Sequence, residues 1–167
     1  MSPAEIAKNE ILALVAEIND DIDAIKKLLP HLLKVLSSIK QNEDPVQIMS
    51  AAGYLHHIYT AIESIHERIV RIIDGSLPIE ERWHQELLTR VGVEVAKVRP
   101  AIISSITRAR LARLLRFRHF FRHAYRIDFL AEEVINTASD IEETLMQYEN
   151  ELKTFCDHLI KAADDLN

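Results

Sequence analysis

The chain has 167 residues, of which 48% are hydrophobic, and a formal net charge of −6. Three glycines and five prolines leave little turn chemistry for a sheet, so the composition favours long helices. No apolar run reaches the ~18 residues of a membrane span, no signal-peptide pattern opens the chain, and the single Cys156 cannot form an internal disulfide. We therefore expect one cytoplasmic all-α domain over residues 1–167.

Two long helices are predicted in the first half. Ser2-Pro3-Ala4-Glu5 matches a capping box with an early proline, and helically spaced apolar residues then predict a helix over residues 3–40. Pro30 is expected to kink or break this helix. Asp44-Pro45 predicts the start of a second helix, which should end at Asp74-Gly75 because glycine is a common helix stop. Three histidines on the second helix are interpreted as surface or satisfied core residues: His56, His57 and His66.

Three further helices are predicted in the second half. The first covers about 78–96, and the backbone at Arg99-Pro100 should be non-helical because the residue before proline avoids the α region. The next runs from about 104 to 124 or 125. Asp128 is expected to cap the last helix, over about 129–165. Together these elements predict an all-α up-and-down bundle of four to five helices.

Positive charge is concentrated in one part of the chain. Residues 99–127 contain eight arginines and no acidic residue, so the rest of the chain carries a formal charge of −14. A basic strip on an acidic body is typical of a local phosphate-binding surface. The last predicted helix is rich in acidic residues, however, and ion pairs with it would give the arginines a structural role instead.

The densest part of the strip, residues 116–128, reads R-F-R-H-F-F-R-H-A-Y-R-I-D. His123 suits proton transfer because histidine titrates near neutral pH. Arg118 stays charged and offers a planar fork to phosphate oxygens. This pair is a sufficient minimum for RNA cleavage, in which the ribose 2′-OH attacks the adjacent phosphate.

The same stretch has other interpretations. His119 and His123, four residues apart, have the spacing of a metal site, but no Asp, Glu or Cys lies between Arg118 and Tyr125 to complete it, so no metal or cofactor is expected. Tyr125 can be read as an edge-of-core residue. The opposite arc of this helix, with Leu114, Phe117, Phe120, Phe121 and Ala124, is expected to face the core. Leu111 and Leu115 fall under the polar arc, which suggests that a second copy covers them.

The pattern R-x-x-x-x-H-x-Y at Arg118, His123 and Tyr125, with polar His119 after the arginine, resembles the signature of HEPN ribonucleases. It looks closest to the HepT toxins encoded beside a minimal nucleotidyltransferase antitoxin, in a type VII-like toxin–antitoxin system. The resemblance implies a metal-independent endoribonuclease with Arg118 and His123 as catalytic residues. It also implies that His119 and Arg122 support substrate binding and that the antitoxin attaches AMP to Tyr125.

Further expectations follow from the resemblance. Arg99-Pro100 resembles a feature of one HepT-like branch, which implies Arg99 as a second phosphate contact, whereas His119 stands where asparagine is common. The implied partners are RNA, the antitoxin and a second copy, in a homodimer whose motifs share one cleft. Two other functions fit the sequence: a non-catalytic helical subunit that presents substrate to a nucleotidyltransferase, and a purely structural bundle. Neither predicts RNA cleavage.

Overall fold

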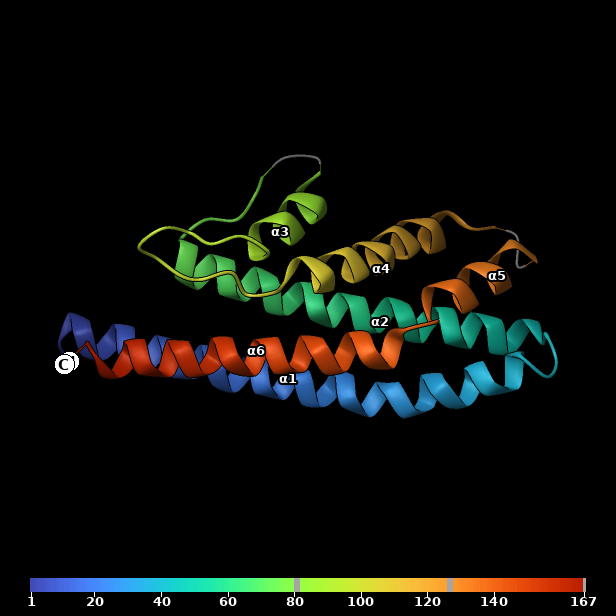
Figure 1. The fold of residues 1–167 in the computed structure, drawn as a ribbon, viewed down its shortest axis with the longest axis horizontal. Coiled ribbons are helices and arrows are strands. Elements are labelled where there is room, and N and C mark those ends of the chain that lie inside the picture. Colours follow the sequence, from blue (N-terminus) through green and yellow to red (C-terminus); the bar gives the residue numbers. More distant parts are fainter. Residues whose placement is uncertain (80–81, 126–127, 167) are drawn as a thin grey trace.

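The computed structural model describes residues 1–79, 82–125 and 128–166, with the backbone alone described at 128 and 129. The elements within these residues are α1 (Pro3–Ile39), α2 (Pro45–Ile69), the π-helical turn η1 (Val70–Asp74), α3 (Trp83–Val91), α4 (Ser105–His123), α5 (Asp128–Thr137) and α6 (Ile141–Asp164). Apart from one isolated bridge between Val95 and Arg99, all regular structure in the described part is helical. The prediction of an all-α bundle is confirmed (Figure 1).

Helix α1 begins at the predicted capping box. The Ser2 side chain accepts a hydrogen bond from the Glu5 amide, and the Glu5 carboxylate accepts one from the Ser2 amide. Of the kink or break expected at Pro30, the break is wrong, since α1 continues through the proline as one helix (Figure 1). Ile25 and Leu32 are buried on either side of the proline, and this packing offsets the lost backbone hydrogen bond.

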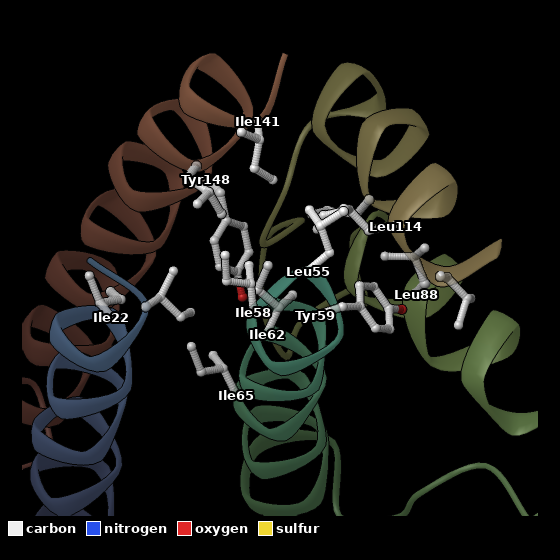
Figure 2. Packing of buried hydrophobic residues seen from close by; sticks show 14 of the residues in the cluster. Ile22, Leu55, Ile58, Tyr59, Ile62, Ile65, Leu88, Leu114, Ile141 and Tyr148 are labelled. Atoms are coloured by element: carbon white, nitrogen blue, oxygen red, sulfur yellow. The ribbon is translucent and has the colours of Figure 1, made fainter. Parts of the chain in front are cut away.

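Helix α2 begins and ends as predicted. The Asp44 carboxylate caps the Val46 amide, and the helix continues through η1 to Gly75, which takes the left-handed conformation with φ of 80°. Figure 2 shows α2 at the centre of the core, with Ile58 and Ile62 on the side of α1 and α6. Tyr59 lies on the opposite side, near Leu88 of α3 and Leu114 of α4.

The second half departs from the prediction in two places. Helix α3 covers only Trp83–Val91 of the expected 78–96, while α4 starts at Ser105, close to the expected position. The Ser104 side chain caps α4. The single helix expected over 129–165 is wrong, because a turn at 138–140 separates α5 from α6. At this turn Ser139 donates from its hydroxyl to the Asn136 carbonyl, a local bond that competes with the helical pattern. The expected cap at Asp128 lies outside the described side chains.

The helices are layered around α2. Helix α6 runs antiparallel beside α1, and a 3.0 Å ion pair between Lys8 and Asp164 joins their ends near the two termini (Figure 1). Helices α3 and α4 cover the other side of α2, so the arginine-rich strip lies away from α1. None of the described helices is long and apolar enough to cross a membrane.

Candidate active site between α2, α3 and α4

Helix α4 buries a wider apolar face than its sequence indicated. Leu111 and Leu115 are 0% and 2% exposed, as buried as Leu114 and Phe117 on the expected core face. The interpretation that a second copy covers the two leucines is therefore wrong, since the chain's own helices bury them. Phe120, expected in the core, is instead 37% exposed.

Arg118 belongs to a mostly buried network with residues from two other helices. Its Nη1 donates a hydrogen bond to Oε1 of Glu63 on α2, and Oε2 of that carboxylate lies 2.6 Å from Nδ1 of His84 on α3. The exposed fractions of the side chains are 12% for Arg118, 5% for Glu63 and 15% for His84. An ionised carboxylate only accepts, so Nδ1 of His84 carries the proton of this bond.

Arg118 keeps hydrogen-bonding capacity after it is anchored. Among the described residues, neither its Nη2 nor its Nε has a hydrogen-bond partner, and Nε is buried. The guanidinium lies over the Tyr59 ring, 6.0 Å from its centre. Because a guanidinium holds five N–H donors in one plane, Arg118 can bind Glu63 through Nη1 and still offer Nη2 to an anion.

His84 is fixed between two neighbours at the wall of an open cavity. Its ring stacks on Trp83, with the ring centres 3.7 Å apart. The cavity has a volume of about 380 Å³ and is lined by Arg82, His84, Gln85 and His119. In the described part of the chain, Nε2 of His84 has no hydrogen-bond partner, so this nitrogen remains free for a ligand.

The structure brings His119 to the same cavity. Its ring meets that of His84 edge to face, with the centres 5.7 Å apart. Partial burial, then the neighbouring His84 and Arg118, lower the pKa of His119 below its ordinary value. His119 is consequently biased towards its neutral form.

The end of α4 is exposed. Arg122 and His123 both lie at the surface, and neither side chain has a hydrogen bond or an ion pair with another described residue. His123 is the last residue of α4, one helical turn beyond His119. Tyr125 follows the helix and is 96% exposed, so its hydroxyl is accessible to another protein.

The expectation that Arg99 binds phosphate is wrong. Its side chain is 0% exposed, and its guanidinium binds both carboxylate oxygens of Asp74 at 2.6 and 2.9 Å. The remaining donors bind the carbonyls of Val93, Pro100 and Arg90, so all five N–H groups are used. Burial alone would raise the pKa of Asp74, but the hydrogen bonds and charges of Arg99 and Arg90 hold it below its usual range. Arg99 therefore fastens the loop before α4 to the end of η1.

Two arginines of the basic strip have a structural role, because they form ion pairs with acidic residues near the start of α6. Arg110 lies 2.7 Å from Glu143, and both Arg110 and Arg113 pair with Asp140. Arg108 and Arg116, by contrast, have no carboxylate partner among the described residues. They line a groove of about 420 Å³ between α3 and α4, together with Gln85, Leu88, Thr89, Ser105, Ala109, Ala112 and Leu115. Because Gln85 also lines the cavity of His84 and His119, the groove adjoins that cavity.

Glu63 and His84 were not anticipated from the sequence. Glu63 does carry a signal, because it lies four residues after Tyr59, on the inward face of α2, where a carboxylate needs a buried cation. His84 carries none, since its contact depends on how α3 docks. Of the α2 histidines, His66 is a satisfied core residue that meets the Tyr148 hydroxyl at 3.1 Å, and His57 is exposed. In the described residues, no group of three or more His, Cys, Asp or Glu could hold a metal ion.

These features define an all-α protein with an arginine–histidine cavity on a locally basic surface. A family model described as HepT-like protein matches residues 50–159, more than half of the chain and including the whole cavity. The chain therefore belongs to the HepT-like family, and its resemblance to HepT-like HEPN toxins is confirmed. No curated protein matches the chain. No solved structure matches it either.

Proposed function

We propose that the protein is a cytoplasmic toxin that cleaves RNA without a metal ion, by attack of a ribose 2′-OH on the adjacent phosphate. The observation that carries this proposal is the state of Arg118, which Glu63 anchors through Nη1 while Nη2 has no partner among the described residues. Arg118 lies next to His84, which lines the cavity together with His119. A guanidinium that is hydrogen-bonded through one nitrogen and unpaired at another can bind an anionic oxygen ligand.

In this proposal Arg118 and His123 are the catalytic residues. Negative charge grows on the non-bridging phosphate oxygens as the 2′-oxygen attacks, and Arg118 stabilises that charge. His123 takes part in proton transfer, for which its exposed position leaves the imidazole free. The products are a 2′,3′-cyclic phosphate and a 5′-hydroxyl.

The surroundings of the cavity support RNA as the substrate. His119 lines the cavity, Arg122 lies exposed on the next turn, and both are proposed substrate contacts. The adjoining groove offers Arg108 and Arg116, neither paired with a described carboxylate, above a floor that includes Leu88 and Leu115. Such a groove suits single-stranded RNA, because the cationic side chains can bind its phosphates and the apolar side chains can pack against its bases.

Control of the toxin is proposed to act at Tyr125. A minimal nucleotidyltransferase antitoxin would use ATP to attach AMP to this hydroxyl, which is 96% exposed. The added phosphodiester is an anion close to Arg122 in sequence, so it would compete with RNA phosphate and also block the cavity sterically. We further propose that the protein acts as a homodimer, with the two cavities on a shared cleft.

The experiment uses the purified full-length protein and one oligoribonucleotide, with and without EDTA. Cleavage that persists in EDTA and leaves a 2′,3′-cyclic phosphate is expected. The same oligonucleotide with deoxyribose at the cleaved position should resist. Cleavage of that deoxy substrate, or abolition by EDTA, would exclude the proposed mechanism. A protein that binds a nucleotidyltransferase yet cuts no RNA would be the non-catalytic subunit.

A further inference from the structure

His84 has the surroundings of a proton acceptor, although it lies outside the motif on α4. Its Nδ1 is bonded to Glu63 at 2.6 Å, while Nε2 has no hydrogen-bond partner among the described residues. The residue lines the 380 Å³ cavity. Trp83, stacked on the ring, and Glu63, bonded to its edge, together fix the plane of the imidazole. The ring is therefore held with Nδ1 engaged and with Nε2 available to a ligand.

We propose that His84 is a second catalytic histidine, the general base that takes the 2′-OH proton in the RNA cleavage proposed above. This inference rests on the proposed function and adds a residue to it. His84 touches the reacting atom through Nε2. Glu63 acts through His84 and Arg118 and is therefore a positioning residue.

The electrostatics of the dyad favour this role. When Nε2 accepts a proton the ring becomes a cation, and the carboxylate bonded to Nδ1 stabilises that cation and fixes the tautomer. Glu63 is 5% exposed, so this interaction is little screened by water. His119, which also lines the cavity, has no carboxylate bonded to its ring among the described residues, and its lowered pKa makes it a weaker proton acceptor.

The position relative to Arg118 completes the geometry. Nη1 of Arg118 lies 3.4 Å from Nδ1 of His84, so a phosphate on the free Nη2 would lie beside the histidine ring. A general base must come within about 2.6–3.2 Å of the atom that it deprotonates. The 2′-oxygen is bonded to the ribose next to the attacked phosphorus, which makes His84 a suitable partner for it.

The step balances without any other reactant. The 2′-OH proton passes to Nε2 of His84, the bond from O2′ to phosphorus forms, and the bond from phosphorus to O5′ breaks. His123 in its imidazolium form gives a proton to O5′. The cyclic phosphate and the 5′-hydroxyl leave, and water exchanges protons with both histidines to restore the starting state.

The first experiment compares His84→Asn with wild type in single-turnover cleavage. Asparagine can still donate a hydrogen bond to Glu63 but cannot take up a proton. One substrate has an ordinary phosphodiester at the cleaved linkage, and the other has bridging sulfur at the 5′ position, whose thiolate leaves without protonation. A loss of about 10²–10⁴-fold on both linkages is expected. Affinity for the all-deoxy oligonucleotide should remain close to that of wild type.

The outcomes separate the roles. Recovery on the sulfur linkage alone would make His84 the acid and overturn its assignment as base. Loss of affinity in proportion to the rate would make it a binding residue. Wild-type rates in His84→Asn, together with an inactive His123→Ala, would overturn this inference and leave the proposed function intact. A wild-type protein that cuts no RNA would overturn both.

Two further variants complete the design. His158→Asn, an exposed histidine of α6, is the matched control and should cleave at the wild-type rate. If His84→Asn does not fold, Glu63→Gln carries the test, since its amide oxygen still accepts from Nδ1 but has no charge to stabilise the imidazolium. This variant should lose at least about tenfold in rate on both linkages, with unchanged affinity. A wild-type rate in Glu63→Gln would overturn the proposal.

Discussion

Arg118 donates a hydrogen bond to a carboxylate 55 positions earlier in the chain, that of Glu63, and the acid is almost completely buried. Arg118, which is proposed to bind phosphate, is thus also the counterion of the buried Glu63 carboxylate. Removal of the arginine would leave Glu63 with His84 as its only hydrogen-bond partner in the described part of the chain, so activity and stability are coupled at this position.

Arg118→Ala should consequently lose stability as well as cleavage. Leaving a buried charge without its partner costs about 3–5 kcal/mol, and the contact to His84 should keep the loss near the lower end of that range. Urea unfolding at pH 7.5 measures the effect. The double variant Arg118→Ala, Glu63→Gln should recover most of the stability, and an equally unstable double variant would contradict the argument.

His123→Ala should abolish cleavage while the fold is retained. The side chain is exposed and makes no hydrogen bond with a described residue, so truncation removes chemistry and no packing. A fall of about 10²–10⁴-fold in cleavage rate is expected, with unfolding midpoints within experimental error of wild type. His57→Ala, an exposed histidine on α2, is the control and should remain active. Full activity in His123→Ala would remove this residue from the site.

The buried pair of His66 and Tyr148 predicts a pH dependence of stability. Burial lowers the pKa of His66 to about 3, whereas the unfolded chain binds this proton near 6.5. The unfolded state therefore holds more protons once the pH falls below about 6.5, and stability decreases from there towards pH 3, by at most about 1.4 kcal/mol per pH unit for this group. His66→Gln keeps a partner for Tyr148 but does not titrate. Urea unfolding at pH 7.5, 6.0 and 5.0 should show a shallower decrease for this variant, and parallel curves would refute the assignment.

Tyr125→Phe should keep cleavage yet escape the antitoxin. The change removes only a hydroxyl that is exposed to solvent, so neither the core nor Arg118 is disturbed. Intact mass after co-expression with the nucleotidyltransferase is the measurement, and wild type should gain at least one AMP. Tyr54→Phe, a half-buried tyrosine of α2, is the control and should still be modified. A neutralised wild-type chain without an adduct would point to inhibition by binding alone.

Arg108→Ala and Arg116→Ala should weaken RNA binding and lower its salt dependence. Each proposed phosphate contact on a single strand contributes about −0.7 to the slope of log affinity against log salt, so each variant should have a less negative slope by about that amount. Titration of a non-cleavable oligonucleotide between low and moderate salt measures it. Arg71→Ala, on η1, should bind as wild type does, because Arg71 does not line the groove. Unchanged slopes in both groove variants would remove the groove from the RNA path.

Local signals explain what the sequence predicted well. The caps at Ser2 and Asp44 and the stop at Gly75 depend on residues within one or two turns, and the structure has all three. The split between α5 and α6 was missed because the turn at 138–140 still fits a helical apolar period. At this turn Asp140 forms ion pairs with Arg110 and Arg113 of α4, and the spacing of apolar residues does not predict such contacts.

The site was predicted only where it lies on one helix. Arg118, His119 and His123 follow from the motif on α4, and their roles remain proposals. Arg99 was misassigned because the sequence cannot show that its guanidinium binds the carboxylate of Asp74, 25 positions earlier. Glu63 and His84 come from separate helices, so their meeting depends on packing and not on any local spacing.

The double role of Arg118, in activity and in stability, affects which inactivating mutations of the gene should persist. On the proposed function, a cell that escapes the toxin by mutating Arg118 also loses a stable chain, which proteases would remove. A cell that escapes by mutating His123 keeps a folded, inert protein with an intact Tyr125, still able to occupy the antitoxin. Surviving lineages should therefore carry inactivated copies of the second kind, and such a copy would compete with a second, active toxin for AMP transfer by the antitoxin.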